Sequence, residues 1–204
     1  MQQTLAVKLA PTPEQHAALV VTLERFNAAC NAIGQVAFRA RLANKFALQK
    51  LVYYSMRDRF GLSSQMTIRA ISKVVEVYKR DKSIQPTFRP HGALPYDERI
   101  MSWQGLEQVS LLALEGRQLI ACRLGGYQQA RRDRLRGQAD LILRDGAFYL
   151  YATLDVPDVP TADVQDYLGI DLGIINIAVD SEGILRGVVT LSIIRRAMNP
   201  SAAL

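Results

Sequence analysis

Cysteine and histidine are scarce in this chain of 204 residues, which contains two of each. Cys30 and Cys122 lie far apart and belong to no C-x-x-C pair, so we expect two free thiols in a reducing compartment. With only His16 and His91 to add, the sequence does not supply the ligand set of a structural zinc site. A disulfide framework and a zinc site are therefore not expected.

Long apolar runs are also lacking, because no stretch approaches the roughly 20 residues that a membrane span needs. The first residues, Met1–Thr4, lack the basic and apolar regions of a signal peptide. We therefore expect a cytoplasmic protein with no membrane partner. With 49% hydrophobic and 22% charged residues, the composition is that of a globular protein with one or two domains.

Positive charge is present in moderate excess and is unevenly placed. The net charge is +6, from 25 Lys and Arg against 19 Asp and Glu. Residues 1–90 hold 14 basic and 5 acidic side chains, a net of +9, whereas residues 91–160 have a net of −1 and residues 161–204 a net of −2. Such a localised basic field favours a polyanionic partner, nucleic acid first and an anionic membrane second.

The first part of the chain predicts one strand followed by helices. Residues 4–9 alternate in polarity as a strand does. Thr12, Pro13 and Gln15 then form the capping box and first turn of a helix. Its buried face is predicted to contain Leu19, Leu23, Phe26, Cys30 and Ile33.

Two further helices are predicted, one over residues 44–60 that stops at Gly61, and one that begins near Ser63-Ser64. In the latter, Ile68, Ile71, Val75 and Tyr78 lie on one face, and Arg69, Lys73, Glu76 and Arg80 on the opposite face. The charged stripe is typical of a solvated surface. Together with Lys79 and Lys82 it could equally follow the phosphates of a nucleic acid.

The remainder favours strands, because prolines and glycines after Ile84 exclude a helix. Residues 110–114 and 117–123 predict one hairpin. Residues 140–144 and 147–154, joined by Asp145-Gly146, predict a second. Between the two hairpins lies a second basic cluster that includes Arg131, Arg132 and Arg134. The order predicts a β module interrupted by a helical block.

The segment Tyr167–Asp180 reads as a nearly continuous apolar strand with one carboxylate in its middle, Asp171, and glycines two residues before and after it. An ionised aspartate there is costly to bury unless it is paired or bound to a cation. RNase H-like nucleases use such a strand to bind Mg²⁺ in a two-metal site, and actin-like ATPases use one to wrap phosphates. An aspartate that only hydrogen-bonds at a sheet edge is the third alternative.

Six short blocks, taken in order, resemble the TnpB (OrfB)-type transposon proteins, which are RNA-guided DNA nucleases related to the type V CRISPR effectors. The resemblance is to the N-terminal part of that family and runs from about residue 5 to residue 183. The blocks are residues 8–15, 26–31, 61–65 with 77–79, 88–92 with 96–99, the Asp145-Gly146 hairpin and residues 169–173.

The resemblance implies an α+β fold in three parts. A split β-barrel wedge module would comprise residues 1–10 and 84–160, and a helical recognition module, residues 11–83, would interrupt it. Residues 161–204 would then begin a RuvC-like nuclease domain of the RNase H fold.

The resemblance also implies partners and a site. The partners would be a guide RNA and a target or transposon DNA. Asp171 would be the first catalytic aspartate and a ligand of Mg²⁺. The nucleic-acid contacts are assigned to Arg69, Lys73, Lys79, Arg80, Lys82, Arg131, Arg132 and Arg134.

The sequence departs from the family after Asp171. The further catalytic carboxylates and the C-x-x-C zinc ribbon of the family come later than residue 204. We therefore expect a truncated protein with an incomplete, Mg²⁺-type RuvC site that cleaves nothing by itself. The alternatives are a non-catalytic regulator that competes for RNA or DNA, and a nuclease completed by a second polypeptide. The unfinished sheet would favour self-association.

Overall fold

The structure, a computed structural model, describes residues 2–105, 107–131 and 135–156. Farther along the chain it describes residues 170–171, 178–180 and 185–186. The chain divides into two compact units, Met1–Pro157 and Asp158–Leu204. Each unit is considered by itself. The first contains four helices and a seven-stranded sheet within its described residues, so the α+β prediction is confirmed.

The three long helices begin at the capping residues that the sequence predicts, and the second of them ends at Gly61 as predicted. The helices are α1 (Pro13–Arg39), α2 (Lys45–Phe60), α3 (Ser64–Arg80) and the short α4 (Gly126–Gln129). Thr12 and Gln15 form the predicted capping box of α1. The side chains of Asn44 and Ser63 cap α2 and α3, and Gly61 ends α2 in the left-handed conformation with φ 61°.

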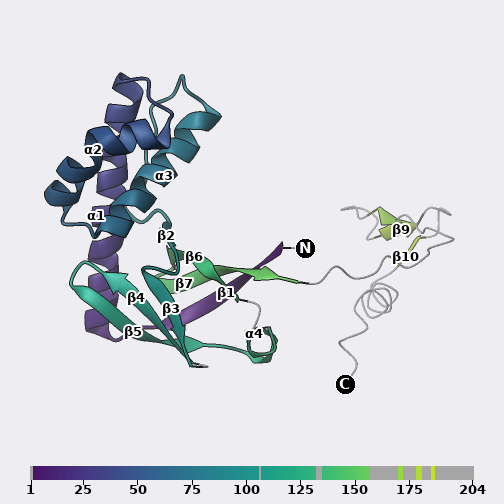
Figure 1. The fold of residues 1–204 in the computed structure, drawn as a ribbon. Helices are drawn as coiled ribbons and strands as arrows, with labels where there is room; N and C mark the ends of the chain where they lie inside the picture. The colour runs from purple at the N-terminus through teal and green to yellow at the C-terminus, as the bar shows by residue number, and fades with distance from the viewer. Residues whose placement is uncertain are drawn as a thin grey trace. The chain divides into compact units, whose positions relative to one another are not determined.

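Seven antiparallel strands form one strongly curved sheet. They are β1 (Gln2–Ala10), β2 (Leu94–Tyr96), β3 (Met101–Gln104), β4 (Gln108–Ala113), β5 (Gly116–Arg123), β6 (Leu135–Arg144) and β7 (Ala147–Asp155). Their order is β2-β6-β7-β1-β5-β4-β3. The edge strands β2 and β3 are consecutive in the chain, and β3 also contacts β6. The sheet is therefore a nearly closed barrel (Figure 1).

The two predicted hairpins are both present, as β4–β5 and β6–β7. The turn between β6 and β7 consists of Asp145 and Gly146 with φ angles of 51° and 72°, the conformation that an Asp-Gly turn favours. Strand β1 lies between β7 and β5, opposite residues more than 110 positions away in the chain. The helices α1 to α3 are thus inserted within one β module.

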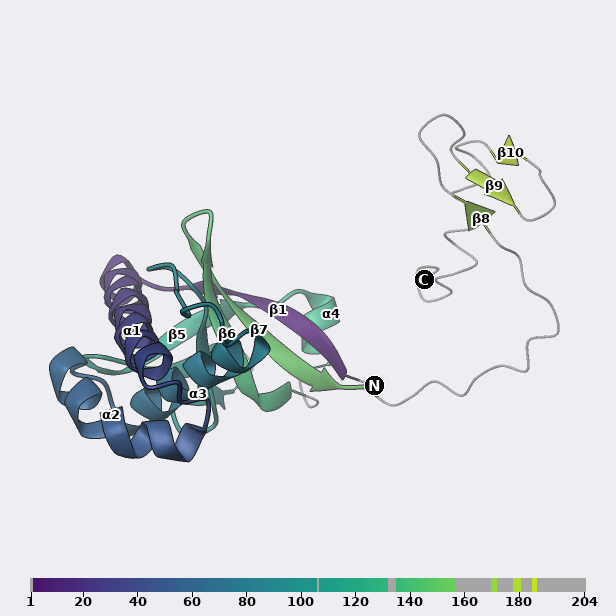
Figure 2. The same cartoon turned by 90° about the horizontal axis from the view of Figure 1, so that it is seen from above.

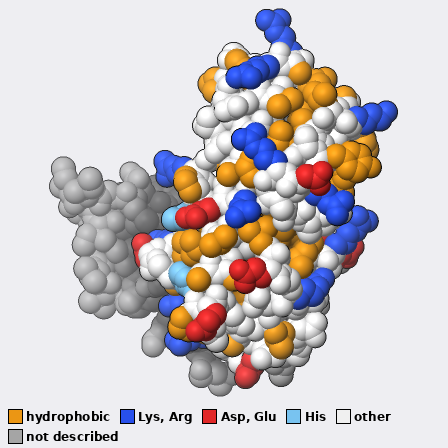
Figure 3. Space-filling model, turned by 90° about the vertical axis from the view of Figure 1, so that its left-hand side faces the viewer, with side chains coloured by type: hydrophobic (Ala, Val, Ile, Leu, Met, Phe, Trp, Pro, Cys, Tyr) orange, Lys and Arg blue, Asp and Glu red, His pale blue; other side chains and the backbone are white. Residues whose placement is uncertain are grey.

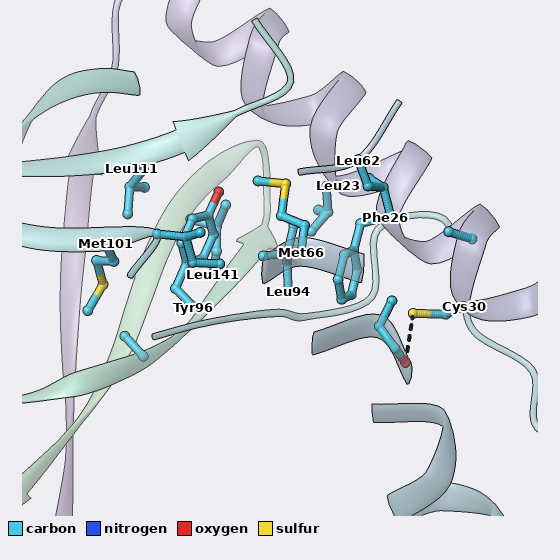
Figure 4. Packing of buried hydrophobic residues seen from close by; sticks show 14 of the residues in the cluster. Leu23, Phe26, Cys30, Leu62, Met66, Leu94, Tyr96, Met101, Leu111 and Leu141 are labelled. Carbon is cyan, nitrogen blue, oxygen red and sulfur yellow. Dashed lines mark hydrogen bonds between the residues drawn. The ribbon is translucent and has the colours of Figure 1, made fainter. Parts of the chain in front are cut away.

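The core continues from the sheet into the helices without a break (Figure 4). Leu23, Phe26 and Met66 from the helices and Tyr96 and Leu141 from the sheet belong to one buried cluster. The buried residues predicted for α1, which are Leu19, Leu23, Phe26, Cys30 and Ile33, are all fully buried. Figure 2, seen from above, shows α1, α2 and α3 bundled together beside the sheet.

An extended segment, residues 85–93, connects the helices to β2 and crosses α1; we call it the strap. Asn31 exchanges two hydrogen bonds with the backbone of Phe88, at 2.9 and 2.7 Å. A Cβ on Gly34 would lie 2.7 Å from the carbonyl oxygen of Pro86, so glycine is required for this close approach. The strap is therefore fixed along one side of α1.

The second unit contains β8 (Ile170–Asp171), β9 (Ala178–Asp180) and β10 (Leu185–Arg186). These strands form an antiparallel sheet in the order β10-β9-β8, with Asp171 opposite Val179. The prediction of one continuous strand over Tyr167–Asp180 is wrong, because β8 and β9 both belong to that segment and pair antiparallel with each other. The predicted hairpin partner after residue 183 is present as β10, which pairs with β9. The side chain of Asp171 lies outside what the structure describes.

Candidate nucleic-acid interface

The predicted basic residues fall into groups with different environments. Lys79, Arg80 and Lys82 are exposed at the end of α3. Arg69 and Lys73 are only partly exposed and contact other parts of the chain. Arg131 follows α4, and Arg132 and Arg134 lie outside the described residues. The charged face of α3 is therefore not uniformly exposed, because Arg69 contacts β2 and Lys73 contacts the strap.

The ammonium group of Lys73 is surrounded by groups of its own chain. Its ammonium donates hydrogen bonds to Asn27 Oδ1, at 3.0 Å, and to the carbonyl oxygen of Ala93. The rings of Phe26 and Phe88 lie 5.5 and 5.0 Å from Nζ, within the range of cation–π attraction. Burial lowers the pKa of Lys73 from its ordinary value, and the nearby Cys30 and Asp140 oppose this effect. Lys73 thus joins α1, α3 and the strap.

Arg69 belongs to a second polar cluster, at the barrel closure. Its Nη2 donates to the Tyr96 carbonyl at 3.4 Å, and its Nε lies 3.7 Å from a carboxylate oxygen of Asp97. The same carboxylate accepts from Gln65 of α3 and from the backbone N–H of Arg99. Asp97 is buried, so these donors satisfy it and fix α3 to the turn between β2 and β3.

A cleft of about 310 Å³ lies beside these two clusters, and its charges are balanced. Arg69 and Lys73 line it together with Glu76 and Asp140. Asp140 is exposed as a whole residue, but the partial burial of its carboxyl raises its pKa. The positive charges of Lys73 and Arg69 act in the opposite direction and lower that pKa. Two cations against two carboxylates give no net field for a polyanion, so this cleft is a weak candidate for phosphate binding.

A different site is basic throughout. Arg39, Arg41, Lys79, Arg80 and Lys82 are all exposed at the end of the helical bundle that lies farthest from the sheet, and we call them the distal basic cluster. Arg39, Arg41 and Lys82 line a hollow of about 680 Å³ together with Phe38, Tyr78 and Ser83, and Lys79 and Arg80 lie next to these lining residues in the chain. Among the described residues, none of the five forms an ion pair.

Asp81, the acidic residue between Arg80 and Lys82, is engaged by local hydrogen bonds. The carboxylate of Asp81 accepts hydrogen bonds from the backbone N–H of Ser83, at 2.8 Å, and from its hydroxyl, at 2.6 Å. These bonds lower the pKa of Asp81. Its carboxylate is engaged locally, so the five cations remain available for an anionic ligand.

Arg41 occupies an unusual backbone position in this cluster. Its φ is 53°, and the N–H of Leu42 donates to the carbonyl of Ala37 at 2.9 Å, which is the Schellman end of α1. Glycine is the usual residue there, because a side chain in this conformation costs about 1 kcal/mol. The sequence prediction missed Arg39 and Arg41, since it grouped Lys79, Arg80 and Lys82 with the charges of α3, and the two arginines lie about 40 residues earlier in the chain.

A smaller basic site lies at α4. The guanidinium of Arg131 stacks on the ring of Tyr127, 3.7 Å from its centroid, and donates to the Tyr127 carbonyl at 3.3 Å. Tyr127 is 55% exposed. A stacked arginine on an exposed aromatic ring is suited to a phosphate or a base, although the predicted Arg132 and Arg134 next to it are outside the described residues.

No group of three His, Cys, Asp or Glu side chains in the described part of the chain could hold a metal ion. The predicted Mg²⁺ site at Asp171 is not tested by this finding, since that side chain is not described. In the same part of the chain, no helix has the length and apolarity needed to cross a membrane. Cys30 is a buried thiol, as predicted, whereas Cys122 is only partly buried.

Comparison of the chain with protein-family models finds no match, and comparison with curated proteins finds none that is significant.

Proposed function

We propose that the first unit binds RNA through the distal basic cluster, as the guide-RNA-binding part of a TnpB-like protein. The observation that carries the proposal is the cluster itself. Five exposed cations lie at the ends of α1 and α3, three of them line one hollow, and none of the five forms an ion pair among the described residues. Phosphate groups are the anions that such closely spaced lysine and arginine side chains bind most readily.

The rest of the proposal follows the resemblance. The curved sheet would be the wedge module and the helices the recognition module. The second unit would belong to a RuvC-like domain that acts on target DNA, with Asp171 as a Mg²⁺ ligand. What supports this is the antiparallel β8–β9 pair with Asp171 in its first strand. A regulator that competes for RNA or DNA would use the same basic cluster.

The RNA-binding proposal predicts an affinity that falls steeply with salt. Binding of a structured RNA by the purified chain should give a linear plot of log affinity against log salt concentration, because bound cations are released. The triple variant Lys79→Gln, Arg80→Gln and Lys82→Gln should reduce the slope by about 0.7–0.9 for each phosphate contact that is lost. Filter binding or fluorescence anisotropy over a salt series measures it.

Two further variants make the experiment specific. Arg144→Gln removes one positive charge from the β6–β7 turn, where Arg144 pairs with Asp145 at 3.5 Å, and should leave the slope unchanged. Arg41→Gly should weaken RNA binding while thermal stability stays the same or rises, because glycine suits a φ of 53°. A slope near zero for the unaltered chain would contradict RNA binding through phosphates.

The nuclease part is tested with Asp171→Ala. Any Mg²⁺-dependent nicking of DNA by the chain, alone or with an added polypeptide, should be lost in this variant, since the proposal assigns Asp171 to the metal. RNA affinity should be unchanged, because the distal basic cluster belongs to the other unit. A gel assay of supercoiled plasmid measures nicking, and nicking that persists in Asp171→Ala would exclude this residue from the chemistry.

A further inference from the structure

Helix α2 buries a narrow stripe and exposes large hydrophobic side chains on the rest of its surface. Its buried residues are Leu48, Val52 and Met56. By contrast, Phe46 and Tyr54 are each 73% exposed. Exposed aromatic rings of this size on one helix are unusual for a surface that contacts only water, and they indicate a binding face.

The exposed aromatic rings alternate with basic side chains. Phe46, Lys50, Tyr54 and Arg57 follow one another at spacings of four, four and three residues, which places them within an arc of about 80° of the helix. Lys50 and Arg57 are exposed, and neither forms an ion pair within the described residues. Figure 3 shows hydrophobic and basic side chains side by side over the helices, in its upper part.

The charge of α2 decides between possible occupants. The helix has Lys45, Lys50, Arg57 and Arg59 against the single acidic residue Asp58. A second copy of the chain would bring like charges together at this face, which is unfavourable. The occupant must be anionic and must also offer flat surfaces to the two rings.

We infer that the outer face of α2 binds single-stranded RNA, with unpaired bases stacked on Phe46 and Tyr54 and phosphates beside Lys50 and Arg57. This inference rests on the proposed RNA binding and adds a second contact surface to it. The two rings are eight residues apart, about 12 Å along the helix axis. In a duplex the base faces are stacked on each other, so the α2 face selects unpaired nucleotides.

The test compares a labelled oligouridine with an RNA duplex of the same length. The double variant Phe46→Ala with Tyr54→Ala should lower affinity for the oligouridine by at least about tenfold, because each stacked base contributes strongly to binding. Affinity for the duplex and the salt slope should be unchanged, since no charge is removed. Leu51→Ala is the matched control, because Leu51 is 57% exposed on the same helix but has no ring.

Conservative variants guard against misfolding. Phe46→Trp with Tyr54→Phe keeps both rings and should retain oligouridine binding, and the new indole fluorescence should be quenched by oligouridine and not by the duplex. Equal loss of single-strand and duplex affinity in the alanine variant would overturn the inference. So would aromatic-dependent binding to phosphatidylserine vesicles without any effect on RNA, which would indicate a membrane surface instead.

The outcomes separate the two proposals. If the unaltered chain binds no RNA, the proposed function fails and the α2 inference fails with it. If RNA binding depends on the distal basic cluster but is the same in the Phe46→Ala with Tyr54→Ala variant, only the α2 inference is overturned.

Discussion

Replacement of Asn27 by leucine is expected to lower the free energy of unfolding by about 3–5 kcal/mol. Asn27 is fully buried in α1, and its Nδ2 donates to the carbonyls of Leu23, Pro90 and Gly92 at 2.9, 3.1 and 2.7 Å. Its Oδ1 accepts from Lys73 at 3.0 Å. Leucine would leave two strap carbonyls and a partly buried ammonium without this partner, and each unsatisfied group costs about 1–3 kcal/mol.

Urea denaturation, monitored by circular dichroism, measures the free energy of unfolding of the Asn27→Leu variant. Gln35→Ala on the same helix is the matched control, because Gln35 is exposed and should change stability by less than about 0.5 kcal/mol. A loss of under 1 kcal/mol in Asn27→Leu would show that the strap is not held through this side chain. If Asn27→Leu lowers the stability as expected, adding Lys73→Met to this variant should recover part of the lost stability, because it removes the uncompensated cation.

Stability is expected to fall as the pH rises above 9, through the thiol of Cys30. Burial among apolar residues raises its pKa from about 9 to about 12, and its Sγ is 4.0 Å from the Ala70 carbonyl (Figure 4). Between these values the unfolded chain loses the thiol proton and the folded chain keeps it, so stability decreases with pH. By pH 10.5 this contributes a loss of about 2 kcal/mol.

The Cys30→Ala variant isolates this term. Other groups also act at alkaline pH: the lowered pKa of Lys73 makes stability rise toward its unfolded pKa, whereas the raised pKa of Tyr96 makes it fall. The Tyr96 contribution is common to both proteins, and Lys73 interacts electrostatically with Cys30, so the difference between the two pH profiles reports Cys30 together with its interaction with Lys73. The variant is less stable at pH 8, because it leaves a cavity, but its profile should be flatter. Parallel profiles from pH 8 to 10.5 would contradict the prediction.

Two of the sequence blocks that carry the TnpB resemblance have a structural role. Residues 26–31 belong to α1 and residues 88–92 to the strap, and the structure brings them together through Asn27, Asn31 and Phe88. Residues 96–99 fix the barrel closure through Asp97. These blocks therefore determine how the helices attach to the sheet, and the exposed cations and rings that could bind RNA lie elsewhere.

The local elements could be predicted because their determinants are close in sequence. The capping box of Thr12 and Gln15, the left-handed Gly61 and the Asp145-Gly146 turn each depend on a few neighbouring residues. The buried face of α1 followed from its periodicity alone. The closure of the barrel could not be obtained in this way, since β1 pairs with strands more than 110 residues later.

The candidate site shows the same division. The sequence by itself determined that the positive charge lies in the first 90 residues and that Lys79, Arg80 and Lys82 belong with the charged stripe of the helix that begins near Ser63-Ser64. Only the tertiary structure decided that Arg39 and Arg41 line a hollow with Lys82, and that Lys73 is held inside by Asn27 and the strap. A helical pattern shows which side chains share a face, but packing determines whether another segment covers that face.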